Sequence, residues 1–146
     1  MYRPERDGAI VPDVRSLPAA FLAALRDREE VLVTSREPGQ QGTVPTWFLV
    51  EPGGSLYLFT LAFSRKAQRW RTDPWVRLTV PGTPISAEGH VQFVTPAELG
   101  DEAAARIVER WAMQGAPTVE GLRRGLRDGL YALVRVTGLP ASSSDA

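Results

Sequence analysis

Residues 43–60, TVPTWFLVEPGGSLYLFT, decide the fold class of this chain. Two apolar runs, rich in β-branched and aromatic residues, flank the turn-forming residues 52–55 (PGGS), which predicts two antiparallel strands joined by a tight turn. Working outward, the same strand character recurs in residues 30–35 (EVLVTS), 75–80 (WVRLTV), 85–94 (ISAEGHVQFV) and 129–139 (GLYALVRVTGL). The sequence therefore predicts about six strands, most of which come before residue 95.

Short helices are predicted between these strands and after them. Residues 17–29 (LPAAFLAALRDRE) carry apolar side chains at a helical spacing, and residues 64–72 (SRKAQRWRT) have room for one or two turns before Asp73-Pro74. Residues 95–98 (TPAE) form a capping box, so a helix is expected to start there. This helix should run to about residue 111, and a weaker helical segment should follow residue 117. Because strands and helices do not alternate regularly, the pattern favours a mainly β fold, a barrel of antiparallel strands with peripheral helices.

Composition limits the classes of function that fit this chain. Its 146 residues suit one domain over residues 1–146, with residues 1–12 and 141–146 as frayed tails. Lys and Arg total 17, as do Asp and Glu, so the basic excess typical of a nucleic-acid-binding protein is missing. There is no cysteine to form disulfides or thiolate metal sites, and no apolar stretch long enough to span a membrane. We therefore expect a cytoplasmic protein without a nucleic-acid or membrane partner.

The charged stretch SRKAQRW, residues 64–70, stands between two predicted strands. Ser64, Arg65 and Lys66 at the start of a short helix would offer a phosphate a hydroxyl, a guanidinium fork and a point charge. The same cations, with Arg69, also fit an ordinary solvated helix face. Charge pattern alone leaves both interpretations open.

Residues 31–80 resemble the flavin-binding split-barrel family, which includes pyridoxamine 5′-phosphate oxidase and relatives that use the deazaflavin coenzyme F420. The resemblance lies in an ordered series: P-x-W-F-x-V at residues 45–50, a glycine turn, L-Y-x-x-T at 56–60, S-R-K at 64–66 and D-P-x-V at 73–76. It implies a split β-barrel of the FMN-binding type. It also implies a homodimer that holds FMN, or coenzyme F420 as the alternative, in clefts at the subunit interface.

The resemblance also assigns residues of this chain to the cofactor. The strand around Trp47 would lie against the ring, and the helix start would hold the phosphate. The cofactor-binding residues expected on this basis are Thr46, Trp47, Phe48, Leu49, Phe59, Thr60, Ser64, Arg65 and Lys66. Three further arginines would either meet the anionic oligoglutamate tail of F420 or be solvated: Arg36, Arg69 and Arg71.

No particular side chain is predicted to be catalytic. A bound flavin performs the redox chemistry, while the protein positions the ring and tunes its electronics. The single histidine, His90, is expected to face outward from its strand, and no metal site is predicted. True pyridoxamine 5′-phosphate oxidases carry a C-terminal block that grips the substrate phosphate, and residues 130–146 contain nothing similar, so vitamin B6 oxidation is not expected.

The sequence thus favours an FMN- or F420-dependent oxidoreductase acting on a small organic substrate. One alternative keeps the fold without catalysis: a protein that stores, carries or senses a flavin or haem. Another is a split barrel that has lost its ligand and acts only through dimerisation.

Overall fold

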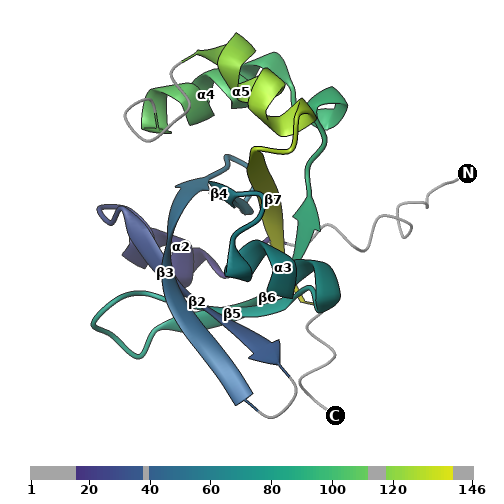
Figure 1. Ribbon diagram of the computed structural model, residues 1–146. Coiled ribbons are helices and arrows are strands. Elements are labelled where there is room, and N and C mark those ends of the chain that lie inside the picture. Colours follow the sequence, from purple (N-terminus) through teal and green to yellow (C-terminus); the bar gives the residue numbers. More distant parts are fainter. Residues whose placement is uncertain (1–15, 38–39, 112–117, 140–146) are drawn as a thin grey trace, which may run out of the picture.

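The computed structural model describes residues 16–37, 40–111 and 118–139. Within them, strands form a closed antiparallel barrel in the order β2-β3-β4-β7-β6-β5, and β5 pairs back onto β2 (Figure 1). The strands are β2 (Glu30–Glu37), β3 (Gln40–Val50), β4 (Leu56–Leu61), β5 (Trp75–Thr79), β6 (Ser86–Phe93) and β7 (Tyr131–Gly138). The predicted mainly β barrel with outer helices is therefore confirmed, whereas the predicted tails, residues 1–12 and 141–146, lie outside the described residues.

Side chains alternate between the interior and the outside of the barrel. In β6, Ala87, Gly89 and Val91 are buried, whereas Glu88 and His90 between them are exposed, as expected for His90. The interior is filled by apolar side chains from every strand: Val31, Val33, Phe48, Leu56, Leu58, Val76, Leu78, Ala87, Val91, Val134 and Val136. The period-two pattern of the sequence thus encodes which face of each strand is buried.

Two short helices close the ends of the barrel. Helix α2 (Ala19–Leu25) contributes Phe21 and Leu25 to the core, and α3 (Arg65–Thr72) contributes Trp70. In Figure 1, which looks along the barrel, α3 crosses in front of the opening and α2 lies behind it. No helix in the described part of the chain is both long and apolar enough to cross a membrane.

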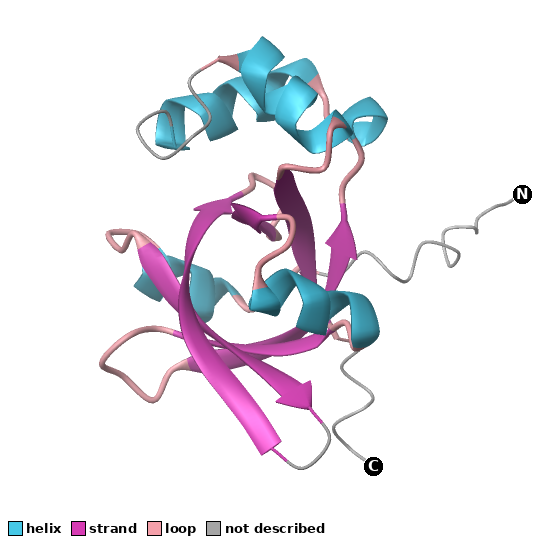
Figure 2. Cartoon of the chain, in the orientation of Figure 1, coloured by secondary structure: helices cyan, strands magenta, loops and turns pink. Residues whose placement is uncertain are grey.

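A helical layer covers one outer side of the barrel. Helices α4 (Asp101–Trp111) and α5 (Val119–Arg127) lie together there, next to the 3₁₀ turn η1 (Pro96–Glu98) (Figure 2). Their buried side chains join the outward-facing aromatic residues of β4 in a second apolar cluster: Tyr57, Phe59, Leu99, Ala104, Ile107, Trp111, Leu122 and Leu133. The helical layer therefore packs against the outer face of β4 and β7.

The capping box at Thr95 is present, but the helix expected from it is interrupted. The Glu98 N–H donates to Thr95 Oγ1 (3.3 Å), and the Thr95 N–H donates to Glu98 Oε1 (2.9 Å). The turn nevertheless ends at Leu99, which is extended (φ −84°, ψ 114°) and 3% exposed. The long helix starts only at Asp101, because burying the Leu99 side chain in the second cluster takes the backbone out of helical geometry.

Candidate functional site

A cleft opens where β3 and β4 separate. Strand β3 pairs with β2 from Gln40 to Trp47, but with β4 only from Trp47 to Val50. Pro45 lacks the N–H that would extend a ladder toward β4. The resulting cleft has a volume of about 390 Å³ and is lined by Glu30, Pro45, Thr46, Trp47, Phe59, Thr60, Leu61, Lys66 and Tyr131. Its size falls within the range of about 300–1,000 Å³ that small-molecule sites occupy.

Aromatic side chains form one wall of this cleft. Trp47 and Phe59 are directly opposite each other on β3 and β4, so they share a face of the sheet. This is the outer face, since both belong to or pack against the cluster formed with the outer helices. Phe59 stacks on Trp111 of α4, with ring centroids 5.0 Å apart and an interplanar angle of 11°. It also contacts the ring of Tyr131, 5.2 Å away. The helical layer therefore holds Phe59 in place and leaves it only 3% exposed, so the apolar surface open to a flat ligand is mainly that of the half-buried Trp47.

Lys66, in the first turn of α3, forms the polar end of the cleft. Ser64 is the N-cap residue, and its hydroxyl accepts a hydrogen bond from the Ala67 N–H (3.2 Å). Thr60 Oγ1 donates to Ser64 Oγ (3.4 Å), which ties β4 to the helix start. Lys66 Nζ donates to the Pro45 carbonyl oxygen (3.3 Å) across the opening. Burial lowers the pKa of the Lys66 ammonium, and the nearby Glu30 carboxylate acts in the opposite direction.

Thr46 leaves a polar atom unsatisfied beside this cleft. The residue is 1% exposed, and Thr46 Oγ1 has no hydrogen-bond partner among the described residues. Buried hydroxyl groups in native proteins nearly always have a partner, so an orphaned one calls for an explanation. The oxygen has almost no accessible surface, and Thr46 faces the barrel interior like Phe48 two residues later, so this hydroxyl is closed to the cleft.

The structure brings together some of the residues predicted to bind the cofactor. Those that line the cleft are Thr46, Trp47, Phe59, Thr60 and Lys66. The Phe48 side chain instead lies in the barrel core, 3% exposed, and Leu49 borders another hollow. Ser64 and Arg65 do not line the cleft: Ser64 caps α3, and the first helical residue, Arg65, is exposed.

Sequence reasoning missed Glu30, Pro45, Leu61 and Tyr131 as parts of this cleft. Glu30 reaches it because it is the cross-strand partner of Trp47, and Tyr131 because it pairs with Leu61. Both depend on strand register, which no single stretch of the sequence encodes. Pro45, inside an apolar run, was the one local signal for a cleft at this point, because proline interrupts the hydrogen bonding of a strand ladder.

The other hollow, of about 410 Å³, lies between α2 and the end of β3. Its lining is mostly aliphatic, and the guanidinium of Arg110 at its side is already engaged. Arg110 Nε donates to the Phe48 carbonyl (3.0 Å), and Nη2 donates to the Arg28 carbonyl (3.1 Å). This hollow therefore lacks the combination of aromatic wall and polar end found between β3 and β4.

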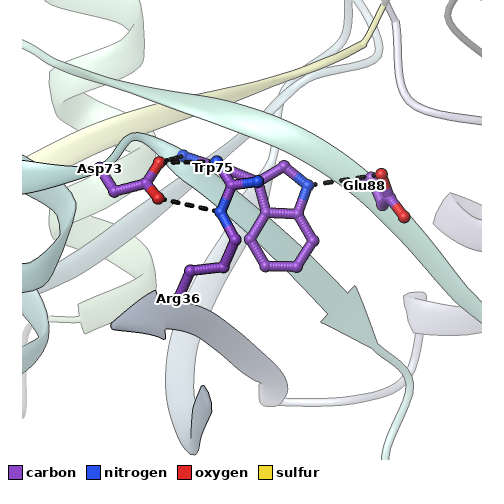
Figure 3. Close-up of polar contacts among 4 residues, drawn as sticks. All are labelled: Arg36, Asp73, Trp75 and Glu88. Atoms are coloured by element: carbon purple, nitrogen blue, oxygen red, sulfur yellow. Dashed lines mark hydrogen bonds and ion pairs between the residues drawn. The ribbon is translucent and has the colours of Figure 1, made fainter. Parts of the chain in front are cut away.

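The arginines considered for an anionic tail are in contact with the protein itself. Arg36 makes two hydrogen bonds with the Asp73 carboxylate, both 2.9 Å, and its guanidinium lies 4.6 Å from the Trp75 ring (Figure 3). Arg71 donates to the Ala62 carbonyl (3.0 Å). The Arg69 guanidinium packs so closely against Gly42 that a Cβ there would lie 2.5 Å from Nη1. None of these arginines lines the cleft.

Comparison with known proteins gives the fold a name. No protein-family model matches the chain, and no curated protein matches it. Among solved structures, the haem storage protein HutZ of Vibrio cholerae is similar with a TM-score of 0.60 and 15% identity, over 86% of this chain and 92% of HutZ. A FAD-binding protein of Mesorhizobium loti is similar with a TM-score of 0.56 and 15% identity, over 87% of this chain and 92% of that protein. An F420 reductase is similar with a TM-score of 0.57 and 17% identity, over 84% of this chain and 96% of that protein.

The chain has the split-barrel fold. That conclusion agrees with the resemblance in residues 31–80 and with the closed antiparallel barrel of the structure. Two of these proteins are named for different ligands, one for haem and the other for FAD. Because one fold hosts several functions, the ligand of this chain has to be argued from its own cleft.

Proposed function

We propose that this split barrel is a homodimeric oxidoreductase that binds a flavin or deazaflavin in the cleft between β3 and β4. The observation that carries the proposal is the separation of these strands beyond Trp47 and Phe59, which places an aromatic wall beside a lysine-bearing helix start. FMN and coenzyme F420 both combine a flat conjugated ring with a phosphate.

The residues of the cleft suit the two parts of such a cofactor. The half-buried Trp47 side chain would lie against the ring and exclude water from it, while Phe59, buried opposite Trp47, would support that wall. The Lys66 ammonium would move from the Pro45 carbonyl to the phosphate. It would be joined there by the backbone N–H groups of Arg65 and Lys66, since the next N–H, that of Ala67, already donates to Ser64. Arg65 is exposed at the same helix start, and its guanidinium would contact an outer oxygen of the phosphate.

A bound flavin or deazaflavin supplies hydride transfer, so the protein needs no nucleophile of its own. The chain positions the ring and leaves space for a small organic substrate on the solvent side of the cleft. The cleft lining contains one carboxylate and one ammonium group, Glu30 and Lys66, which influence the charge of whatever binds between them. Tyr131 is the one cleft residue with a phenolic hydroxyl, and it stands at the ring wall.

A second subunit would cover the open side of the cleft. Three apolar side chains beside it are exposed: Leu61 (50%), Phe63 (65%) and Leu130 (52%). They lie together because Leu61 pairs with Tyr131 and the Ala62 N–H donates to the Leu130 carbonyl (2.9 Å). Contiguous exposed apolar side chains mark interaction sites, so this patch supports a homodimer with the cofactor at the interface.

Haem binding at this cleft has no comparable support. His90, the single histidine of the chain, lies on the outer face of β6 and does not line the cleft. The described residues also contain no cluster of His, Cys, Asp and Glu that could hold a metal ion. An aromatic cleft with one lysine fits a flavin ring and a phosphate better than it fits an iron ligand.

The proposal is tested by titrating the purified protein with FMN and with coenzyme F420 and following the change in cofactor fluorescence. Saturable binding is expected for at least one cofactor. Lys66→Ala should weaken it about ten- to a hundredfold, because a charge-assisted hydrogen bond contributes about 1.5–3 kcal/mol. Replacing Arg65 together with Lys66 should weaken it further.

The control variant is Arg127→Ala, which removes the same charge from an exposed position at the end of α5. Its affinity should equal that of the wild type. Absence of saturable binding to either cofactor would contradict the proposal, as would equal effects of Lys66→Ala and Arg127→Ala.

A further inference from the structure

The hollow between α2 and the end of β3 is a second cavity, which the proposed function does not use. Its volume of about 410 Å³ falls within the range of about 300–1,000 Å³ that small-molecule sites occupy. Leu25 and Phe48 line it and belong to the barrel core, 0% and 3% exposed, so they form its floor. The described residues that line this hollow are apolar apart from Arg26 and Arg110, and none of them is acidic.

Short side chains on α2 keep the hollow open. Ala19 and Ala23, one helical turn apart, line it and are exposed. Leu22, Leu49 and Val50 also line it and are only half-buried. Apolar surface is therefore left open to solvent here, and a ligand with a hydrocarbon part would gain free energy by covering it.

Arg110 holds a positive charge at the side of this hollow. Its Nε donates to the Phe48 carbonyl (3.0 Å), its Nη2 donates to the Arg28 carbonyl (3.1 Å), and its guanidinium lies 5.2 Å from the centroid of the Phe48 ring. These contacts fix the guanidinium in place, but both acceptors are neutral. Among the described residues, Arg110 forms no ion pair, and its Nη1 has no hydrogen-bond partner. A fixed guanidinium with unused N–H donors is suited to a carboxylate.

Arg26 adds a second cation to the lining. It is the C-cap residue of α2 and is exposed, and it too forms no ion pair within the described part of the chain. Because no acidic side chain lines the hollow, the two positive charges lie beside apolar surface without a counter-charge in the lining. A ligand that combines one negative charge with a hydrocarbon body would match both properties.

We infer that this hollow binds an aliphatic carboxylate, with its head group against Arg110 and Arg26 and its chain against the half-buried leucine and valine side chains. A carboxylate matches the planar fork of the fixed guanidinium. A chain fits better than a flat ring, because the one aromatic side chain of the lining, Phe48, is buried beneath that guanidinium. The hollow shares no lining residue with the cofactor cleft, so this inference does not depend on the proposed function.

Isothermal titration calorimetry of the full chain with sodium octanoate tests the inference, and octan-1-ol and octylamine serve as probes with the same chain length. Octanoate should bind saturably and at least about fivefold more tightly than octan-1-ol, because charge-assisted hydrogen bonds are stronger than neutral ones. Octylamine should bind more weakly than either, because the two arginines repel it. Hexanoate should bind about four- to fifteenfold more weakly than octanoate, the effect of two methylene groups that are partly or fully removed from water.

Two pairs of variants place the ligand in the hollow. Ala23→Phe fills it and should weaken octanoate binding at least about tenfold, whereas Ala20→Phe, at an exposed position of the same helix outside the lining, should leave binding unchanged. Arg26→Gln should weaken octanoate binding about two- to fivefold, the effect of one exposed charge, and leave octan-1-ol unaffected. Arg127→Gln, at the exposed end of α5, should change neither affinity.

Three results would overturn the inference. The first is the absence of saturable octanoate binding to the wild type. The second is equal affinity for octanoate and octan-1-ol, which would show that the positive charges take no part. The third is an equal effect of the two phenylalanine substitutions, which would place octanoate elsewhere on the protein. Ala23→Phe should leave the affinities for FMN and F420 unchanged, so none of these results decides the proposed function.

Discussion

Trp47 is the residue at which β3 changes its pairing. Up to Trp47 the strand pairs with β2, and from Trp47 onward it pairs with β4. Pro45 lies two residues before Trp47, and the buried Thr46 lies between them. Because Pro45 has no N–H to donate, this segment does not continue the β3–β4 ladder. The separation of β3 from β4 is thus encoded by a few residues in the middle of β3, and the candidate site lies at that point.

Asp73 provides a pH-dependent test of the surface around β2 and β5. Its carboxylate accepts two hydrogen bonds from Arg36 and one from the Trp75 N–H (3.1 Å). The hydrogen bonds from Arg36, followed by the one from Trp75, lower the pKa of Asp73 below its ordinary value of 3.8. A lowered pKa in the folded protein adds stability above the ordinary pKa, and this gain is lost as the pH falls through the lower, folded-state value.

We therefore expect Asp73→Asn to be less stable than the wild type at pH 7 in urea unfolding. The difference should shrink as the pH falls below the ordinary pKa and should be lost once the wild-type carboxyl is also protonated. A stability difference that is constant over this range would show that the ion pair is not its cause.

Gly125 shows how a helix position determines the shape of the cleft wall. The residue is buried in α5, and a Cβ at this position would overlap the ring of Tyr131. Alanine would favour the helix by about 1 kcal/mol, but overpacking against a ring typically costs about 1–3 kcal/mol. We expect Gly125→Ala to lower the free energy of unfolding by about 1 kcal/mol, as measured by urea denaturation.

A double-mutant cycle identifies the cause of that loss. In a Tyr131→Ala background, the same Gly125→Ala substitution should no longer destabilise the protein and should gain the helix preference of alanine. If Gly125→Ala destabilises both backgrounds equally, the ring of Tyr131 is not what requires glycine there.

Most elements follow from local sequence patterns, whereas their relative placement does not. The turn at Pro52-Gly53-Gly54 and the alternation in β6 predict strands correctly because turn chemistry and period-two burial are local properties. The capping box at Thr95 predicts a helix start but not the interruption at Leu99, because burial of that side chain depends on the second apolar cluster. Local signals thus locate the elements and leave tertiary exceptions to the structure.

The candidate site shows the same division between local and tertiary information. Trp47, Phe59 and Lys66 are close together in the sequence, and the resemblance in residues 31–80 placed them at one site. Glu30 and Tyr131 come from strands outside that segment and reach the cleft only through register with Trp47 and Leu61. A single sequence does not encode that register explicitly.

At the scale of the whole molecule, the exposed apolar patch beside the cleft predicts self-association. Replacing Phe63 and Leu130 together by Ser should shift the protein from a dimer toward the monomer mass of 16.0 kDa, because it removes apolar surface from the interface. Gel filtration with light scattering measures the mass directly.

Ile85→Ser is the matched control, because Ile85 is 41% exposed but lies just before β6, outside the cleft. It should remain dimeric. A wild-type protein that is already monomeric would contradict the proposed interface, and so would a double variant that remains fully dimeric.

The central claim is that a flavin-type ring binds against Trp47 in the cleft between β3 and β4. The most direct measurement is the ¹⁵N–¹H NMR spectrum of the indole groups, because the chain has four tryptophans, Trp47, Trp70, Trp75 and Trp111, and each gives one indole signal. Single Trp→Phe variants assign them.

On addition of saturating FMN or F420, the Trp47 signal should shift most, since the ring would lie against it. Trp75, on the outer face of β5 and bonded through Nε1 to Glu88 (3.4 Å), should stay in place. An unchanged spectrum with both cofactors, or a shift of Trp75 without one of Trp47, would contradict the account.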